Sequence, residues 1–301
     1  MTMRIRSARV IGPGCRPKLG AVVATALSAL ACLAVGSDRA GAYVYWVHQG
    51  GFFEGEIGRA NLNGRGKDRE FIPHAIGPEA VAVGHRHVYW INGDDDSIGR
   101  ARLDGTHRNQ RFIDGVVFAR DLVLTRRHLY WTSDQTIGSD ASIGRANVDG
   151  TAIDRAFIPF GGPEFTTPLE IDVHGGYIYW ANAYPTYAIG RARTDGTEVD
   201  QRFITDGVKN PFGLAVDRSH IYWSNRGTRS ISRASIDGSN PQIEFIGDTG
   251  RVSSLDVHRR FLYWPTPGSR IIRARRNGSH VKTLVHRAAG ISVAVDGRGV
   301  R

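Results

Sequence analysis

The sequence predicts an all-β fold, a six-bladed β-propeller whose blades are four-stranded antiparallel sheets. Three observations predict it. A Tyr-Trp pair recurs six times along the 301 residues, an Ile-Gly-Arg-Ala-like tetrad follows each pair, and an Asp-Gly or Asn-Gly pair follows each tetrad. A unit of about 43 residues with these features has the size of one propeller blade. The hydrophobic share of 41% argues against a disordered chain.

The six copies are regular enough to align by eye, and the Tyr-Trp pairs use all six tryptophans. The pairs begin at Tyr45, Tyr89, Tyr130, Tyr179, Tyr222 and Tyr263. The tetrads begin at Ile57, Ile98, Ile143, Ile189, Ile231 and Ile271. An apolar strand before each Tyr-Trp pair and a Phe-Ile-like segment after each turn complete four strands per unit.

Local chemistry explains each element of a unit. Asp-Gly and Asn-Gly pairs favour positive φ angles, so we predict a two-residue hairpin turn between the third and fourth strands. No segment after residue 43 shows a sustained helical period, so helices should be few. One sheet cannot bury both of its faces alone, and six sheets in a ring bury them against one another.

The order of segments also predicts how the ring closes. The chain enters the first unit at its second strand, Tyr43–Val47, with no first strand before it. Residues Ile291–Val295 match the first-strand pattern and have no Tyr-Trp pair after them. We therefore expect this last strand to complete the first blade.

The N-terminal segment, residues 1–42, is typical of a secretion signal, and residues 43–301 form the propeller domain. A basic stretch precedes the apolar run Leu19–Val35, and Ala40-Gly41-Ala42 is a small-x-small cleavage pattern. Both cysteines, Cys15 and Cys32, lie in this segment, so the mature chain would have no disulfide or thiolate metal site. We expect a secreted or cell-envelope protein without a transmembrane segment in the mature chain. Lipid anchoring at Cys32 is the alternative.

Charge argues against nucleic acid as a partner. The formal charge is +10, but residues 1–42 hold six basic residues and one acid. The remaining 33 basic and 28 acidic residues leave +5, too small and scattered a surplus for a phosphate-binding surface.

We also expect the protein to be a monomer.

The unit resembles the YWTD, or class B, repeats of low-density-lipoprotein-receptor-like proteins, which form six-bladed propellers. The resemblance rests on the Tyr-Trp, Ile-x-Arg-Ala and Asp-Gly elements and covers about residues 43–296. The Thr-Asp that follows Tyr-Trp in that family is replaced, for example by Ile91-Asn92 and Ala181-Asn182. The Ile-Gly-Arg element is also similar to NHL-type propellers and to streptogramin lyases.

Function should reside on the face formed by the loops between second and third strands and by the loops between blades, because their lengths vary. Polar and aromatic residues there are the candidate ligand-binding residues: His48, Phe52, Phe53, Asn92, Asp94, Asp95, Asp96, Asn182, Tyr184, Tyr187 and Asn225. We expect the residues two past each Trp to form a polar circle near the channel mouth, or else to bond nearby backbone. The acidic run at 94–96 offers oxygen ligands to calcium, although a solvated turn is favoured. We expect Phe212 to cover the end of the core.

These features favour a binding module for protein, peptide or glycan ligands over an enzyme. The alternative is a metal-assisted lyase or lactone hydrolase of the streptogramin-lyase or gluconolactonase type. It would use His48 or His74 with a carboxylate such as Glu54, Glu56, Glu79 or Glu164. No catalytic residue is assigned. No cofactor is predicted, with calcium or magnesium as the alternative.

Overall fold

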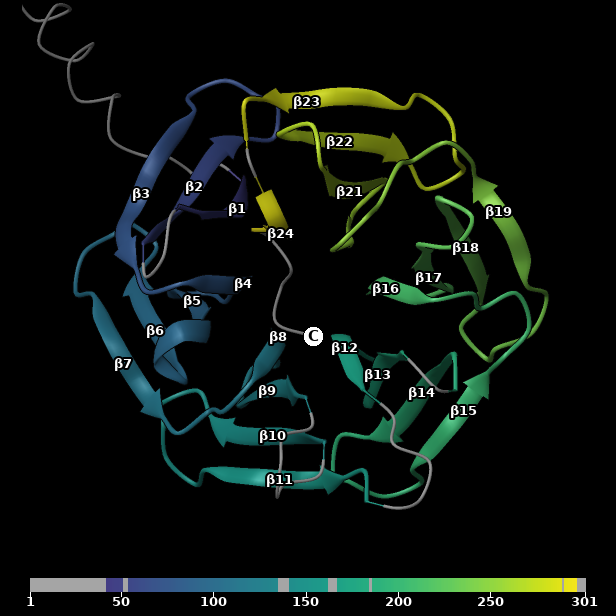
Figure 1. Cartoon of the computed structure of the whole chain (residues 1–301), viewed down its shortest axis with the longest axis horizontal. Helices are drawn as coiled ribbons and strands as arrows, with labels where there is room; N and C mark the ends of the chain where they lie inside the picture. Colours follow the sequence, from purple (N-terminus) through teal and green to yellow (C-terminus); the bar gives the residue numbers. More distant parts are fainter. Residues whose placement is uncertain are drawn as a thin grey trace, which may run out of the picture. The chain divides into compact units, whose positions relative to one another are not determined.

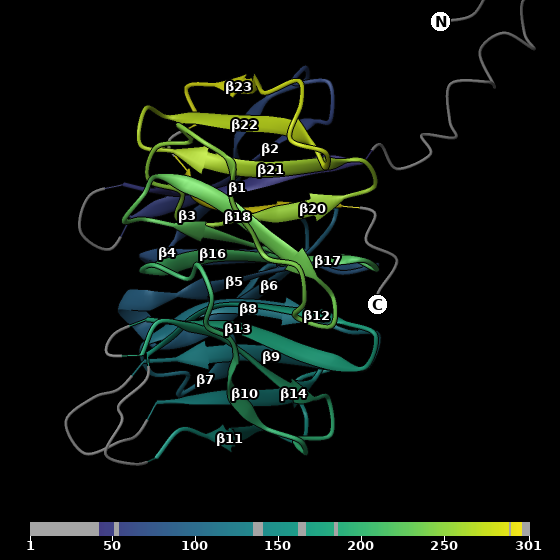
Figure 2. The same cartoon turned by 90° about the vertical axis from the view of Figure 1, so that its right-hand side faces the viewer.

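The computed structural model describes residues 42–50, 54–134, 141–161, 167–183, 186–288 and 290–296, all of them within the compact unit Ala42–Arg301. In this part of the chain, six four-stranded antiparallel sheets stand around a central axis (Figure 1). Figure 2 shows the same ring from the side. The predicted six-bladed β-propeller is confirmed.

Each blade uses one strand of each kind. The innermost strands are β24 (Gly290–Val295), β4 (Pro78–Val83), β8 (Ala119–Leu124), β12 (Pro168–His174), β16 (Pro211–Val216) and β20 (Asp256–His258). The second strands, with the Tyr-Trp pairs, are β1 (Tyr43–Gln49), β5 (His87–Asn92), β9 (His128–Ser133), β13 (Tyr177–Asn182), β17 (His220–Asn225) and β21 (Phe261–Thr266). These lists run in the order of blades 1 to 6.

The two outer positions follow the same order. The third strands, with the tetrads, are β2 (Gly55–Asn61), β6 (Ser97–Arg102), β10 (Ser142–Asn147), β14 (Ala188–Arg193), β18 (Ser230–Ser235) and β22 (Arg270–Arg275). The outermost strands are β3 (Asp68–Ala75), β7 (Asn109–Asp114), β11 (Asp154–Pro159), β15 (Asp200–Ile204), β19 (Gln242–Ile246) and β23 (Lys282–His286). The described residues contain one helical element, the 3₁₀ turn η1 (Gly93–Asp95).

The ring closes as predicted, through the strand nearest the C-terminus. β24 pairs antiparallel with β1, with Trp46 opposite Val293 and Val44 opposite Val295. The sheet order of this blade is β24-β1-β2-β3, so strands from both ends of the propeller share one sheet (Figure 1). Val293 and Val295 are both buried.

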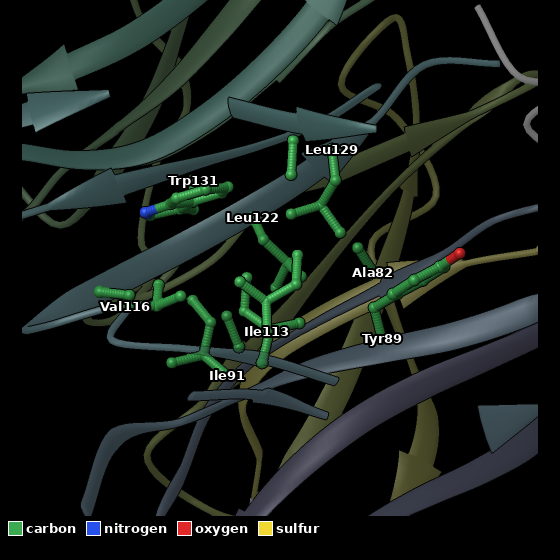
Figure 3. Close-up of a cluster of buried hydrophobic side chains, with 12 residues drawn as sticks. Ala82, Tyr89, Ile91, Ile113, Val116, Leu122, Leu129 and Trp131 are labelled. Atoms are coloured by element: carbon green, nitrogen blue, oxygen red, sulfur yellow. The ribbon is translucent and has the colours of Figure 1, made fainter. Parts of the chain in front are cut away.

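The hydrophobic core consists of layers between neighbouring blades. In the layer between blades 2 and 3, Tyr89 and Ile91 from β5 meet Leu122 from β8 and Trp131 from β9 (Figure 3). All six tryptophans are fully buried in equivalent layers. Removal of a buried Trp ring would cost about 3–5 kcal/mol by the usual scale for core truncations.

The tetrad is a packing device. A Cβ atom on Gly99 would overlap the Trp90 ring on the neighbouring strand, so glycine lets that ring lie flat on β6. The guanidinium of Arg100 lies 3.8 Å from the centre of the Phe112 ring in the same blade. Its Nη1 donates to the carbonyl of Val148 in the next blade (3.4 Å). The equivalent arginines of blades 1, 2, 5 and 6 link their hairpins to the next blade in this way.

The hairpin turn differs from the predicted two-residue form. In blade 2, Gly105 has φ of +85° whereas Asp104 is not left-handed. Arg102 N donates to Thr106 O (2.9 Å) and Gly105 N donates to Arg102 O (2.8 Å), which makes a longer turn with glycine at its one left-handed position. Asp104 Oδ1 accepts from Thr106 N (2.8 Å) instead of occupying a positive φ. The two-residue prediction was wrong because Asp bonds locally and does not need the left-handed conformation.

Candidate functional site

A cavity of about 420 Å³ lies at the mouth of the central channel, on the face predicted to carry function. We call it the channel-mouth cavity. All six blades contribute to it, because the innermost strands begin here. It is lined by Gln49, Glu79, Ala80, Arg120, Asp121, Leu169, Glu170, Phe212, Arg226, Ser253, Ser254, Ile291 and Ser292.

The floor of the cavity is organised by Glu170 on β12. This side chain is buried, and its carboxyl group accepts from Ser254 Oγ (2.5 Å), from Leu255 N (3.1 Å) and from Leu214 N. A Cβ on Gly213 would come within 3.1 Å of Glu170 Oε2, so glycine in blade 5 makes room for Glu170 to reach blade 6. Burial, and secondarily the charge of Asp121, raises the pKa of Glu170 well above its usual range.

Other polar side chains of the channel wall bond from blade to blade in the same way. Asp121 Oδ2 accepts from Ile171 N (2.9 Å), and Ser292 Oγ accepts from Val81 N (3.3 Å). An innermost strand is a sheet edge, and its N–H groups need acceptors where they are buried. These side chains supply them, so the polar floor is a structural feature of the ring.

The blade 2 side of the cavity is acidic. Glu79 is half-buried, and burial raises its pKa; Arg120 opposes this shift and Asp94 adds to it. Arg120 is engaged by a second acid, since its Nη2 donates to Asp134 Oδ2 (2.9 Å). Glu79 and Asp134 therefore both lie near the same arginine, Arg120.

The blade 5 side is cationic. The Arg226 guanidinium lies 3.5 Å from the centre of the Phe212 ring. Its Nε is buried, and in the described part of the chain the Arg226 side chain has no hydrogen-bond or ion-pair partner. Burial, and then the charge of Arg251, lowers its pKa. Phe212, which we expected to cover the core, lines the cavity beneath Arg226 instead.

The predicted asparagines lie inside the blades. Asn92 is fully buried, accepts from Trp90 Nε1 (2.9 Å) and donates to Gln110 O (2.6 Å). Asn182 donates to Gln201 O (2.7 Å), and Asn225 accepts from Lys209 N (2.9 Å). All three lie at the ends of second strands, so the structure places the polar lining of the mouth one strand further in than we predicted.

The acidic run diverges. Asp95 Oδ1 accepts from Arg111 Nη1 (2.6 Å), Asp96 accepts from Phe118 N (3.3 Å), and Asp94 is exposed beside Gly77. Within the described residues, no three His, Cys, Asp or Glu side chains gather into a group that could hold a metal ion.

His48 does not line the channel-mouth cavity, although its neighbour Gln49 does. Its Nδ1 is 2.6 Å from Oε2 of Glu56, its partner across the β1–β2 hairpin. It lines a smaller hollow of about 240 Å³ with Trp46, Arg69, Ser269 and Arg287. Tyr187 is exposed before β14, whereas Phe52, Phe53 and Tyr184 lie outside the described residues.

Sequence analysis did not single out Arg226 as a site residue. The detectable signal is a difference between equivalent positions. The cavity position that Phe212 fills in blade 5 is held by Glu79, Arg120, Leu169, Ser253 and Ile291 in the other blades. A search for repeats identifies positions where the copies agree. This position was not singled out because its residue differs from blade to blade.

None of the described helices is long and apolar enough to cross a membrane. Residues 176–218 match the family model for the low-density lipoprotein receptor repeat class B. This match spans one repeat unit, from β13 to β16.

Two solved structures show the same fold. A chain in the crystal structure of a nidogen/laminin complex is 20% identical, with 85% of this chain and 98% of that chain covered and a TM-score of 0.72. Virginiamycin B lyase from Staphylococcus aureus is 17% identical, with 74% and 75% covered and a TM-score of 0.54. This chain is a six-bladed β-propeller that contains a low-density lipoprotein receptor class B repeat.

Proposed function

We propose that this propeller is an extracellular protein-interaction module that takes a segment of its partner into the channel-mouth cavity. The observation that carries the proposal is the cavity itself. It holds about 420 Å³, within the range of ligand-binding pockets, and it combines apolar walls with half-buried charges.

The composition of the cavity fits a protein segment. Leu169, Phe212 and Ile291 supply apolar contact area, and Gln49 and Arg226 supply polar groups at the rim. Partner side chains that enter such a pocket become desolvated, and anchors of this kind usually supply most of the binding free energy.

Two resemblances support the same function. The class B repeat at residues 176–218 is a repeat of lipoprotein receptors. The nidogen/laminin structure holds a propeller of this fold within a protein complex. Both support a protein partner as a proposal for this chain.

The alternative of a metal-assisted lyase or lactone hydrolase has less support. The His48–Glu56 pair has the composition of an acid–base pair, but it lies outside the channel-mouth cavity. The described residues also do not bring together three side chains that could hold the metal which this chemistry requires.

A peptide selection with a plugged mouth tests the proposal. A random dodecapeptide library is selected on the full chain, and binding of the enriched peptides is measured by calorimetry. Gln49→Trp places a large ring at the rim of the cavity and should weaken binding by about tenfold or more. The matched control is Ile153→Trp, at an exposed position near the Asp-Gly turns of the opposite face, and it should leave binding unchanged. Absence of any specific peptide, or equal binding by the plugged variant, would contradict the proposal.

Export is part of the proposal and has its own test. If residues 1–42 are removed by cleavage after Ala42, the exported protein begins at Tyr43, which N-terminal mass spectrometry reads directly. Lipid anchoring instead predicts a modified Cys32 at the N-terminus, and membrane release by Cys32→Ser.

A further inference from the structure

We infer that the channel-mouth cavity recognises a carboxylate of its protein partner, and that Arg226, held against Phe212, is the residue that binds it. The inference rests on the proposed function, because it specifies the chemistry of the segment that enters the cavity. It comes from one side chain whose surroundings differ from those of the other stacked arginines.

Arg226 is presented rigidly. It lies at the start of the β17–β18 loop, where its backbone N donates to Asn210 O (3.1 Å). The Phe212 ring contacts the guanidinium at 3.5 Å and limits its rotation. A stacked guanidinium keeps its N–H groups in its own plane, where they can meet the two oxygens of a carboxylate together.

The arginine lacks a counter-charge. In the described part of the chain no acid pairs with Arg226, and Arg251 adds a second positive charge nearby. A partly buried cation without a partner is unfavourable, which the lowered pKa of Arg226 also indicates. A ligand carboxylate would remove this cost and form charge-assisted hydrogen bonds.

The rest of the cavity selects among carboxylates. Leu169 in the adjacent blade 4 offers apolar surface beside the arginine, and Ile291 in blade 1 adds apolar surface elsewhere in the cavity. Glu79 in blade 2, on the opposite side, repels a second negative charge. A segment with one acidic residue beside an apolar residue matches this arrangement. A run of acids does not, because part of it would face Glu79.

The test pairs a ligand change with a protein change. Peptides enriched from the random dodecapeptide library on the full chain are synthesised in two forms, the parent and an analogue whose acidic residue is replaced by its amide. Each form is titrated against wild type, Arg226→Gln, and the control Arg251→Gln, which removes a neighbouring exposed charge that does not line the cavity. Thermal unfolding confirms that each variant is folded.

We expect the enriched peptides to contain an acidic residue. Arg226→Gln should bind the acidic parent peptide about tenfold or more weakly than wild type does. The amide analogue should bind wild type and Arg226→Gln within about twofold of each other, because the paired charge is already absent. Arg251→Gln should bind the acidic parent less than about threefold more weakly than wild type, because the charge of Arg251 acts on the peptide only from a distance and through solvent. Arg226→Lys should recover part of the loss, because it keeps the charge but not the planar fork.

The outcomes separate this inference from the proposed function. Peptides that bind at the mouth without an acid, or equally well to Arg226→Gln, would overturn the carboxylate assignment and leave the interaction module standing. Failure to select any peptide would overturn both.

Discussion

Two arginine–phenylalanine stacks in this molecule have nearly the same geometry and different surroundings. Arg100 lies 3.8 Å from the centre of the Phe112 ring, and Arg226 lies 3.5 Å from that of Phe212. Arg100 also donates to the Val148 carbonyl in the next blade, whereas the Arg226 side chain has no acceptor among the described residues. The same pair thus joins two blades in one place and exposes an unpaired charge in another.

The first kind of stack recurs around the ring. Arg59, Arg145, Arg191 and Arg233 each lie 3.8 Å from the Phe ring of the outermost strand of their blade. In blade 6, where Leu284 replaces that Phe, Arg273 stacks on Phe261 at 4.3 Å and still donates to Leu62 O in blade 1 (2.9 Å). Four arginines of this kind, Arg59, Arg100, Arg233 and Arg273, also donate to a carbonyl of the next blade, which indicates a structural role. Arg226 makes no such bond and lines the cavity, which indicates a ligand.

The largest expected effect is on the scaffold. Deletion of residues 290–301 removes β24, which pairs with β1 and buries Val293 and Val295 between blades 1 and 6. We expect a loss of at least about 5 kcal/mol in the free energy of unfolding, enough to abolish cooperative folding. Urea unfolding followed by tryptophan fluorescence measures it. A truncated chain with a wild-type transition would show that the ring does not depend on this strand.

The next prediction separates the two stacks directly. Arg100→Gln should lower the free energy of unfolding by about 1–3 kcal/mol, because it removes the packing on Phe112 and the bond to blade 3. Arg226→Gln should change it by less than about 0.5 kcal/mol, since no internal hydrogen bond is lost and the lost packing on Phe212 is offset by removal of a partly buried, unpaired charge. Peptide binding should show the reverse order. If Arg226→Gln proved the more destabilising, its side chain would have a structural partner and the contrast would fail.

The sequence predicted the scaffold well because the scaffold repeats. Tyr45 and its five equivalents recur because the Tyr-Trp pairs pack between blades in the same way around the ring. The tetrad glycine recurs in four of the six blades, and the strand pattern at Ile291–Val295 indicated how the ring closes. The face that carries the cavity followed from loop length. The length of the Asp104-Gly105 turn did not follow, because the bond from Arg102 N to Thr106 O, and not the dipeptide alone, determines it.

The site was much harder to predict, for a physical reason. Arg226 and Phe212 belong to the cavity because they differ from the residues at equivalent positions in the other blades. Glu170 reaches blade 6 because Gly213 in the blade between them has no side chain. Contacts of this kind, which involve three blades, depend on which residues of the innermost strands face the channel. The sequence of a short apolar strand gives little indication of which residues these are. The asparagines of the second strands gave a stronger pattern, and they are buried.

Glu170 contrasts with Arg226, because the carboxyl group of Glu170 has hydrogen-bond partners within the ring. Burial raises its pKa, so the folded protein holds its proton at a pH where the unfolded chain has released it. Stability from this group is therefore greatest below the usual glutamate pKa, about 4.3, and falls as the pH rises toward the raised value. The difference in free energy of unfolding between wild type and Glu170→Gln should fall steadily from pH 4 upward. A difference that stays constant with pH would show that Glu170 is not protonated in the folded state.

The smallest expected effect concerns Glu79, the acid that faces the cavity from the side opposite Arg226. Glu79→Gln removes a negative charge that repels an acidic peptide, and across a partly hydrated cavity this is worth about a two- to threefold gain in affinity. Because burial raises the pKa of Glu79, this carboxylate is protonated at a higher pH than the carboxylates of an exposed peptide. As the pH is lowered from neutral, wild-type affinity for the acidic peptide should therefore rise modestly before the peptide itself is protonated, and the affinity of Glu79→Gln should stay flat over the same range. Asp104→Asn, on the opposite face, is the matched control and should follow wild type. If wild type and Glu79→Gln gave the same profile, the two sides of the cavity would act independently, and the carboxylate would be read by Arg226 alone.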